Sequence, residues 1–222
     1  MDLPQSERTQ VALLLILTAA TGLVDAFSYL RLGHVFVANM TGNVVFLGLS
    51  LDSDSGLSAV ASIVAIGGFL AGALLGGRFV KHLGRDPRRW LVSVFAVQAV
   101  LLAVMAIVVG RSTLSDRGAL ALITTVVLAG ALGLQNATVR RLAARDLTTT
   151  VLTMTLTGLA ADSILAGGAG QKPQRRLASV AAMLLGAAAG ALLLRVTVAG
   201  VLVVAAVLVA LVAVGFARSP TD

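Results

Sequence analysis

One carboxylate lies deep within an apolar stretch of this sequence, Asp25 in the segment 10–30. A carboxylate within a bilayer costs roughly 2.5–3.5 kcal/mol on insertion scales unless it is paired, protonated or hydrated. Asp25 is therefore a candidate proton relay, cation site or solute contact. In the alternative interpretation, Asp25 lies near the outer end of its segment and caps or anchors the turn that follows.

A second carboxylate, Asp162, lies near the end of the apolar segment 148–167. For this residue we favour a structural role at the cytoplasmic end of the segment. The basic residues that follow closely in the sequence each offer a partner for an ion pair with Asp162, namely Lys172, Arg175 or Arg176.

Amide and hydroxyl side chains gather at the centre of the segment 35–51, where Asn39, Thr41 and Asn43 surround Gly42. Glycine permits backbone conformations that other residues resist, so we expect the helix to break here. A broken helix frees N–H and C=O groups, which in lipid must be satisfied by protein or by a water-lined cavity. The cluster therefore predicts either a solute pathway or polar contacts between helices, which contribute about 0.6 kcal/mol each.

The second half of the chain carries a comparable set of polar residues. Asn136 is the counterpart of Asp25 at an offset of 111 residues. Threonines that recur every two residues do not share one helical face, so a regular helix places only some of them on one path. The predicted solute or ion pathway comprises Asp25, Asn39, Thr41, Gly42, Asn43, Gln135, Asn136, Thr153, Thr155 and Thr157.

Enzyme chemistry is not expected. The chain has two histidines far apart in sequence, no cysteine, no HExxH pattern and no Walker-type loop. Because it offers no thiolate and no catalytic pair, we expect no catalytic residues, no metal and no cofactor.

The composition indicates which elements must hold these residues. Of 222 residues, 58% are hydrophobic and 12% are charged, whereas soluble domains carry about 25% charged residues. The predicted fold class is all-α, a polytopic membrane helix bundle in a single transmembrane domain over residues 1–222. The lipid bilayer is the expected partner. The net charge of +7 does not indicate nucleic acid, because the basic residues lie between apolar segments.

Eight apolar segments follow one another along the chain, and the second and sixth are short or interrupted by polar residues. We therefore predict six full spans plus two short or broken helices. With six spans, 13 of the 17 basic residues lie on one side, whereas eight spans give a split of ten to seven. The positive-inside rule thus favours six spans, with both termini cytoplasmic in a bacterial plasma membrane. Eight spans are the alternative. The segments are 10–30, 35–51, 57–80, 90–110, 118–139, 148–167, 177–194 and 198–217.

The two halves of the chain resemble each other. The run Gly22–Ala26 aligns with Gly133–Ala137 at an offset of 111 residues. This match predicts an internal duplication, with repeat 1 over about 10–110 and repeat 2 over about 118–217. Three spans per repeat is an odd number, so the halves would form an inverted repeat, an arrangement that recurs in transporters.

Two small-xxx-small patterns, Gly72 with Gly76 and Gly186 with Gly190, match at an offset of 114 residues. Such patterns let membrane helices approach closely. They predict helix packing within one protomer or between protomers, which leaves a homo-oligomer open.

Four runs of residues carry a resemblance to a known family. The runs Gly22–Tyr29 and Val35–Asn43, the latter with Asn-Met-Thr-Gly-Asn, resemble the signature of the YoaK-like family of small bacterial polytopic membrane proteins. The runs Gly133–Ala137 and Thr149–Thr155 resemble the second signature of that family. The resemblance covers nearly the whole chain. It implies membership of a family of unknown function and no particular substrate.

The leading functional hypothesis is a small-solute transporter or channel, proton- or cation-coupled through Asp25. The alternative is a non-transporting membrane scaffold or accessory protein. The two differ in whether the polar residues line a continuous hydrated cavity. The sequence does not specify the solute.

Overall fold

The computed structural model describes residues 6–83, 86–115, 118–142, 152–163, 166–167 and 173–218. These residues form α-helices and one short 3₁₀-helix, and the described part of the chain contains no strand. The elements are α1 (Glu7–Arg31), α2 (Met40–Leu49), η1 (Ser53–Ser55), α3 (Ala59–Leu83), α4 (Pro87–Gly110), α5 (Ala119–Arg141), α6 (Leu152–Ala161), α7 (Pro173–Leu193) and α8 (Val198–Ala217).

Six of these helices, α1, α3, α4, α5, α7 and α8, are long and apolar enough to cross a membrane. Helices α2 and α6 have 10 residues each, about 15 Å of helix against a hydrocarbon core of about 30 Å. The prediction of an all-helical polytopic bundle with six spans and two short helices is confirmed. The sixth predicted segment contains a helix of only Leu152–Ala161, and much of the rest of that segment lies outside the described residues.

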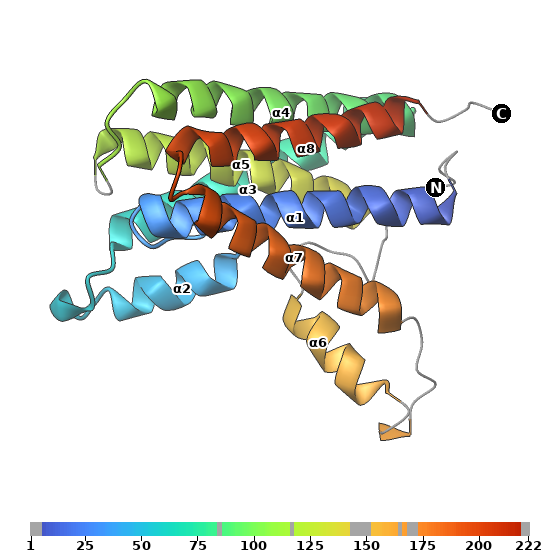
Figure 1. Ribbon diagram of the computed structural model, residues 1–222, viewed down its shortest axis with the longest axis horizontal. Coiled ribbons are helices and arrows are strands. Elements are labelled where there is room, and N and C mark those ends of the chain that lie inside the picture. The colour runs from blue at the N-terminus through green and yellow to red at the C-terminus, as the bar shows by residue number, and fades with distance from the viewer. Residues whose placement is uncertain are drawn as a thin grey trace.

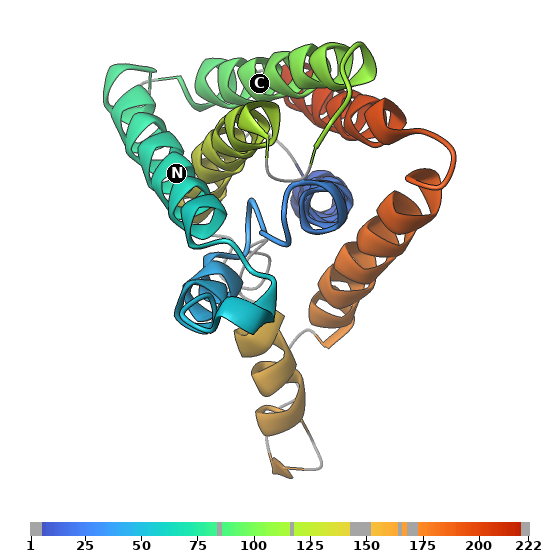
Figure 2. The same cartoon turned by 90° about the vertical axis from the view of Figure 1, so that its left-hand side faces the viewer.

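Helix α1 runs through the centre of the bundle, and the other long helices surround it (Figure 2). Its apolar span is 67% buried, compared with 56% for α5 and 17% for α7. The outer helices therefore present apolar side chains to the surroundings, as in Leu184 and Leu185 of α7. A bilayer accommodates this surface because lipid chains are as apolar as leucine.

The pairing of the helices is unchanged when the first four are exchanged with the last four. Helix α3 packs along α5 as α7 packs along α1, and α1 contacts α8 as α5 contacts α4. Helix α2 contacts α3 as α6 contacts α7, and α4 pairs with α8. This correspondence is what an internal duplication predicts. The inverted orientation of the two halves stays a prediction.

Matched glycines lie at close contacts between helices. A Cβ atom on Gly72 of α3 would overlap the backbone of Gly130 of α5. A Cβ atom on Gly186 of α7 would overlap the backbone of Ala19 of α1. The two glycines are 114 residues apart and their two partners are 111 apart, the offsets found in the sequence. Only the absence of a side chain permits this approach of the backbones.

The second glycine of each pattern faces the same partner helix one turn further along. A Cβ atom on Gly76 would lie 2.9 Å from the Cβ atom of Ala137. A Cβ atom on Gly190 would lie 3.2 Å from the Cβ atom of Ala26. All four glycines that the sequence singles out for packing thus lie against a neighbouring helix of the same chain.

Helix α1 begins, and α8 ends, at the same end of the bundle (Figure 1). Two contacts join elements at this end. The guanidinium group of Arg88, in the first turn of α4, donates a hydrogen bond to the carbonyl group of Ala217. The Nη1 atom of Arg175 at the start of α7 lies 2.6 Å from Oε1 of Glu7. Both described ends of the chain therefore lie on the same side of the spans.

Candidate functional site

The non-helical stretch between α1 and α2, residues 32–39, is the centre of the candidate site. Gly33 and His34 have positive φ angles of 85° and 60°, which turn the chain back after α1. The predicted position of the break is wrong, because Gly42 lies within α2 and the helix begins at Met40. The physical reason is that side chains of α1 and α2 form hydrogen bonds with the backbone groups of residues 36–38, so the chain can stay non-helical until Met40.

Asp25 accepts two of the backbone hydrogen bonds that this non-helical stretch donates. Its side chain is 4% exposed, and its Oδ1 atom accepts hydrogen bonds from the backbone N–H groups of Val37 and Ala38, both at 2.9 Å. These two residues directly precede Asn39, the N-cap of α2. The geometry matches the anchoring alternative for Asp25. Within the described residues, the carboxylate makes no hydrogen bond to Asn136.

Asn43 completes the support from the other side. Its Oδ1 atom accepts a hydrogen bond from the N–H group of Phe36 at 2.9 Å, and its Nδ2 group donates to the Phe36 carbonyl at 2.6 Å. The ring of Phe36 packs against the rings of Tyr29 and Phe46, with centroid distances of 5.3 and 5.5 Å, and those two rings lie 6.1 Å from each other. A Cβ atom on Gly42 would lie 2.8 Å from that ring. Glycine is therefore required here for close packing of the loop on α2, and not for a helix break.

The first turn of α2 carries the exposed part of the cluster. The side chains of Asn39 and Thr41 are exposed, and Asn39 forms no side-chain cap of the helix. In Figures 1 and 2, α2 and α6 lie on the same side of the bundle, between α3 and α7. Their N-terminal ends point towards each other (Figure 1). The structure thus brings the polar start of α2 towards α6.

The threonines of α6 divide between two faces, as their spacing predicts. Thr153 and Thr157 are exposed, whereas Thr155 is buried. Asn136, on α5, donates a hydrogen bond from Nδ2 to the carbonyl group of Leu132 in its own helix at 2.9 Å.

Gln135 belongs to a buried polar network that the sequence analysis only half identified. Its Nε2 group donates to Oγ1 of Thr21 on α1 at 2.9 Å, and its Oε1 atom accepts from Nε2 of Gln98 on α4 at 2.6 Å. The Oε1 atom of Gln98 is buried without a partner within the described part of the chain. The available signal was that Gln98 is the one amide in the apolar segment 90–110.

A polar stripe along α1 was also missed. Thr18, Thr21, Asp25 and Ser28 are all buried and are spaced three, four and three residues apart. This spacing places them on one face of the helix. The hydroxyl groups of both threonines donate back to carbonyls of α1, at 2.9 Å. The side chains of the stripe therefore all have hydrogen-bond partners, so their burial at the centre of the bundle costs little free energy.

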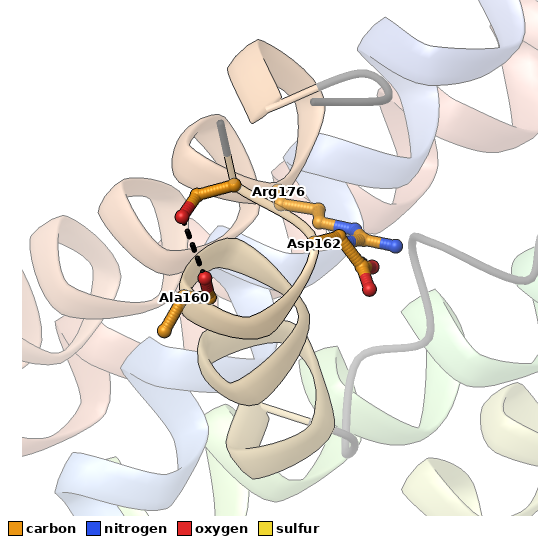
Figure 3. Close-up of polar contacts among 4 residues, drawn as sticks. Ala160, Asp162 and Arg176 are labelled. Atoms are coloured by element: carbon orange, nitrogen blue, oxygen red, sulfur yellow. Dashed lines mark hydrogen bonds and ion pairs between the residues drawn. The ribbon is translucent and has the colours of Figure 1, made fainter. Parts of the chain in front are cut away.

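Asp162 does not belong to this site. Its Oδ2 atom lies 2.6 Å from Nη1 of Arg176, so the carboxylate just after α6 pairs with the first turn of α7 (Figure 3). A Cβ atom on Gly158 would lie 2.9 Å from the guanidinium carbon of Arg176. The predicted structural pairing of Asp162 with the basic stretch is confirmed. Among the described residues, no three His, Asp or Glu side chains gather in a way that could hold a metal ion.

Residues 13–215 match the family model described as Protein of unknown function (DUF1275). The chain belongs to this family. It is also 31% identical, over 153 residues, to the UPF0700 transmembrane protein YoaK of Bacillus subtilis (strain 168), a match that covers 68% of this chain and 65% of that relative. No solved structure matches the chain. The resemblance stated from the signature runs is confirmed, and the chain is a multi-pass membrane protein of this family.

Family membership adds no reaction or solute to the site. Both halves of the first signature, the run that contains Asp25 and the run that contains Asn43, meet in the structure through backbone hydrogen bonds of residues 36–38. The signature therefore encodes the anchoring of a short helix.

Proposed function

We propose that this protein is a small-solute transporter or channel whose pathway passes the N-terminal ends of α2 and α6. One observation carries the proposal: among the described residues, two helices of 10 residues each lie beside six that are long and apolar enough to span a membrane. Irregular backbone at membrane depth is tolerated where it is buried in protein or lines a water-filled cavity. Interrupted helices of this kind form the solute sites of many transporters.

The depth of the loop supports a segment that enters the membrane and returns. Asp25 precedes the end of α1 at Arg31 by six residues, which is about 9 Å of helix. Because Val37 and Ala38 donate to Asp25, the start of α2 lies roughly that far inside the end of α1. The 10 residues of α2 then lead back towards the same end. A crossing helix would not need this anchor.

The chemistry at the two helix starts supports neutral or anionic solutes. A helix N-terminus carries about half a positive charge, and two such ends face each other here. The exposed Asn39 and Thr41 add hydrogen-bonding groups. Asp25 positions α2 through its hydrogen bonds to the backbone. We therefore place the pathway at the starts of α2 and α6 and not at Asp25 itself. Coupling of the flux to a pH gradient is tested separately.

The proposal includes a location and partners. It sets the protein in a bacterial plasma membrane with both termini cytoplasmic, in contact with the bilayer and able to form a homo-oligomer. The 13 basic residues on the side of the termini support this orientation. The competing function is a non-transporting scaffold, which needs no pathway.

Purified protein in liposomes should conduct one class of small solute above protein-free vesicles in a screen of neutral, anionic and cationic compounds, with and without a pH gradient. We expect Thr41→Val to reduce that flux by about 2–10-fold, the effect of one lost hydrogen bond. The matched control is Thr113→Val, an exposed threonine between α4 and α5, which should leave flux unchanged. Folded, inserted protein without flux for any class would favour the scaffold.

A further inference from the structure

A pocket of about 330 Å³ lies at the end of the bundle opposite the chain termini. It forms where α1 and α4 end and α8 begins. Arg31 lines it from α1, Gly110 from α4, and Val198 and Ala199 from α8, while Leu114 contributes from the loop after α4. The volume falls within the range of small-molecule sites. The pocket is separate from the helix starts assigned to the solute pathway.

The charge around this pocket is positive. Arg31 lines the pocket, Arg111 directly follows the lining residue Gly110, and Arg195 lies two residues before the lining residue Thr197. All three arginines are exposed. None of them takes part in an ion pair or hydrogen bond of its side chain within the described part of the chain. Their charges are therefore available to a ligand.

Backbone donors add to the arginines. Val198 and Ala199 are the first two residues of α8, where N–H groups have no acceptor within the helix. Thr197 caps the next donor, because its Oγ1 atom accepts from the N–H group of Gly200 at 3.1 Å. The C-terminal ends of α1 and α4 oppose an anion by about half a charge each. Together these two ends oppose an anion by about the charge of one guanidinium group, such as that of the lining residue Arg31. The start of α8 and the charges of Arg111 and Arg195, which adjoin lining residues in sequence, then favour an anion.

The position of the pocket indicates the kind of anion. Its walls are the ends of three spanning helices, so it lies at the level where lipid headgroups meet the hydrocarbon. Leu114, Val198 and Ala199 give it apolar walls beside the charge. Phosphate pairs well with arginine, whose planar guanidinium offers two parallel donors. A phosphate with an apolar body attached suits this combination of walls.

We propose that this pocket binds the phosphate group of an anionic phospholipid headgroup, with Arg31 as the central contact. The same phosphate chemistry can come from a lipid or from free phosphate, and the test separates the two. This inference does not depend on transport, because a lipid site at this place stabilises the meeting point of α1, α4 and α8 whether or not a solute passes elsewhere.

The test measures binding to the full-length protein in a nonionic detergent, by native mass spectrometry and thermal unfolding. The probes are short-chain phosphatidylglycerol, short-chain phosphatidylcholine and sodium phosphate. We expect phosphatidylglycerol to bind about tenfold more tightly than phosphatidylcholine. Arg31→Gln should weaken phosphatidylglycerol about fivefold, which corresponds to ~1 kcal/mol for one basic side chain at a membrane surface.

A matched control separates the pocket from general charge. The triple variant Arg31→Gln, Arg111→Gln, Arg195→Gln should lose the preference for phosphatidylglycerol. The triple variant Arg78→Gln, Arg140→Gln, Arg218→Gln removes the same charge from exposed positions at the opposite end and should keep it. Retention of the lipid in millimolar phosphate assigns the site to the lipid, and displacement assigns it to free phosphate. An equal preference in both triple variants, or none in the wild type, overturns the proposal.

Discussion

Replacing Gly72 or Gly186 with leucine is expected to destabilise the whole bundle, because each glycine lies where the backbones of two spanning helices pack against each other. The new Cβ atom would overlap the backbone of Gly130 or of Ala19, and a backbone cannot move aside as a flexible side chain can. Overpacking in a core commonly costs 1–3 kcal/mol, so we expect about 3 kcal/mol or more. Two measurements detect the effect: a lower unfolding temperature in detergent, and loss of the monodisperse peak in size-exclusion chromatography.

The same helix supplies the control for this prediction. A Cβ atom on Gly67 or Gly77 of α3 would meet nothing within 4 Å. Gly67→Leu and Gly77→Leu change hydrophobicity and helix propensity as Gly72→Leu does, but should leave the unfolding temperature at or above that of the wild type. Similar behaviour of all three α3 variants would show that close backbone packing between α3 and α5 does not stabilise the fold.

Removal of the Asp25 carboxylate is expected to release the start of α2. Asp25→Ala leaves the N–H groups of Val37 and Ala38 without their acceptor in a buried place. Each unsatisfied group costs about 1–3 kcal/mol, so the loss should be roughly 2–6 kcal/mol for the loop and α2. Proteolysis of the loop and thermal unfolding should both detect it.

Asp25→Asn distinguishes anchoring from a role of the charge itself. The amide oxygen of asparagine can accept both hydrogen bonds, so this variant should keep most of the stability that Asp25→Ala loses. If the two variants are equally damaged, the carboxylate acts through its charge and the anchoring account is wrong. If Asp25→Asn is stable but abolishes pH-dependent flux in a working assay, the result supports the hypothesis that Asp25 couples transport to protons.

The sequence predicted the spans well because hydropathy and length decide them directly. The long apolar segments needed no knowledge of their neighbours, and the distribution of the basic residues favoured six spans over eight. The glycine offsets of 111 and 114 predicted matched positions. The sequence could not tell that Gly72 meets Gly130 on α5, since that partner belongs to the other half of the chain.

The candidate site was harder to predict because its contacts join separate parts of the chain. Asp25 was identified as a costly buried group, but its donors lie 12 and 13 residues later in a loop without periodicity. Gly42 led us to expect a helix break at its own position, but the non-helical stretch ends before α2 begins at Met40. The glycine instead makes room for the ring of Phe36. Gln98 went unnoticed until the fold placed it against Gln135.

Cysteine labelling on the two sides of α2 tests the six-span arrangement most directly. The chain has no cysteine of its own, so His34→Cys, Ser53→Cys and Arg218→Cys each provide a single exposed label site. A re-entrant α2 predicts that His34→Cys and Ser53→Cys both react with a membrane-impermeant maleimide in intact cells, and that Arg218→Cys reacts only after permeabilisation. Reaction of His34→Cys and Ser53→Cys from opposite sides of the membrane would contradict the account, because α2 would then cross.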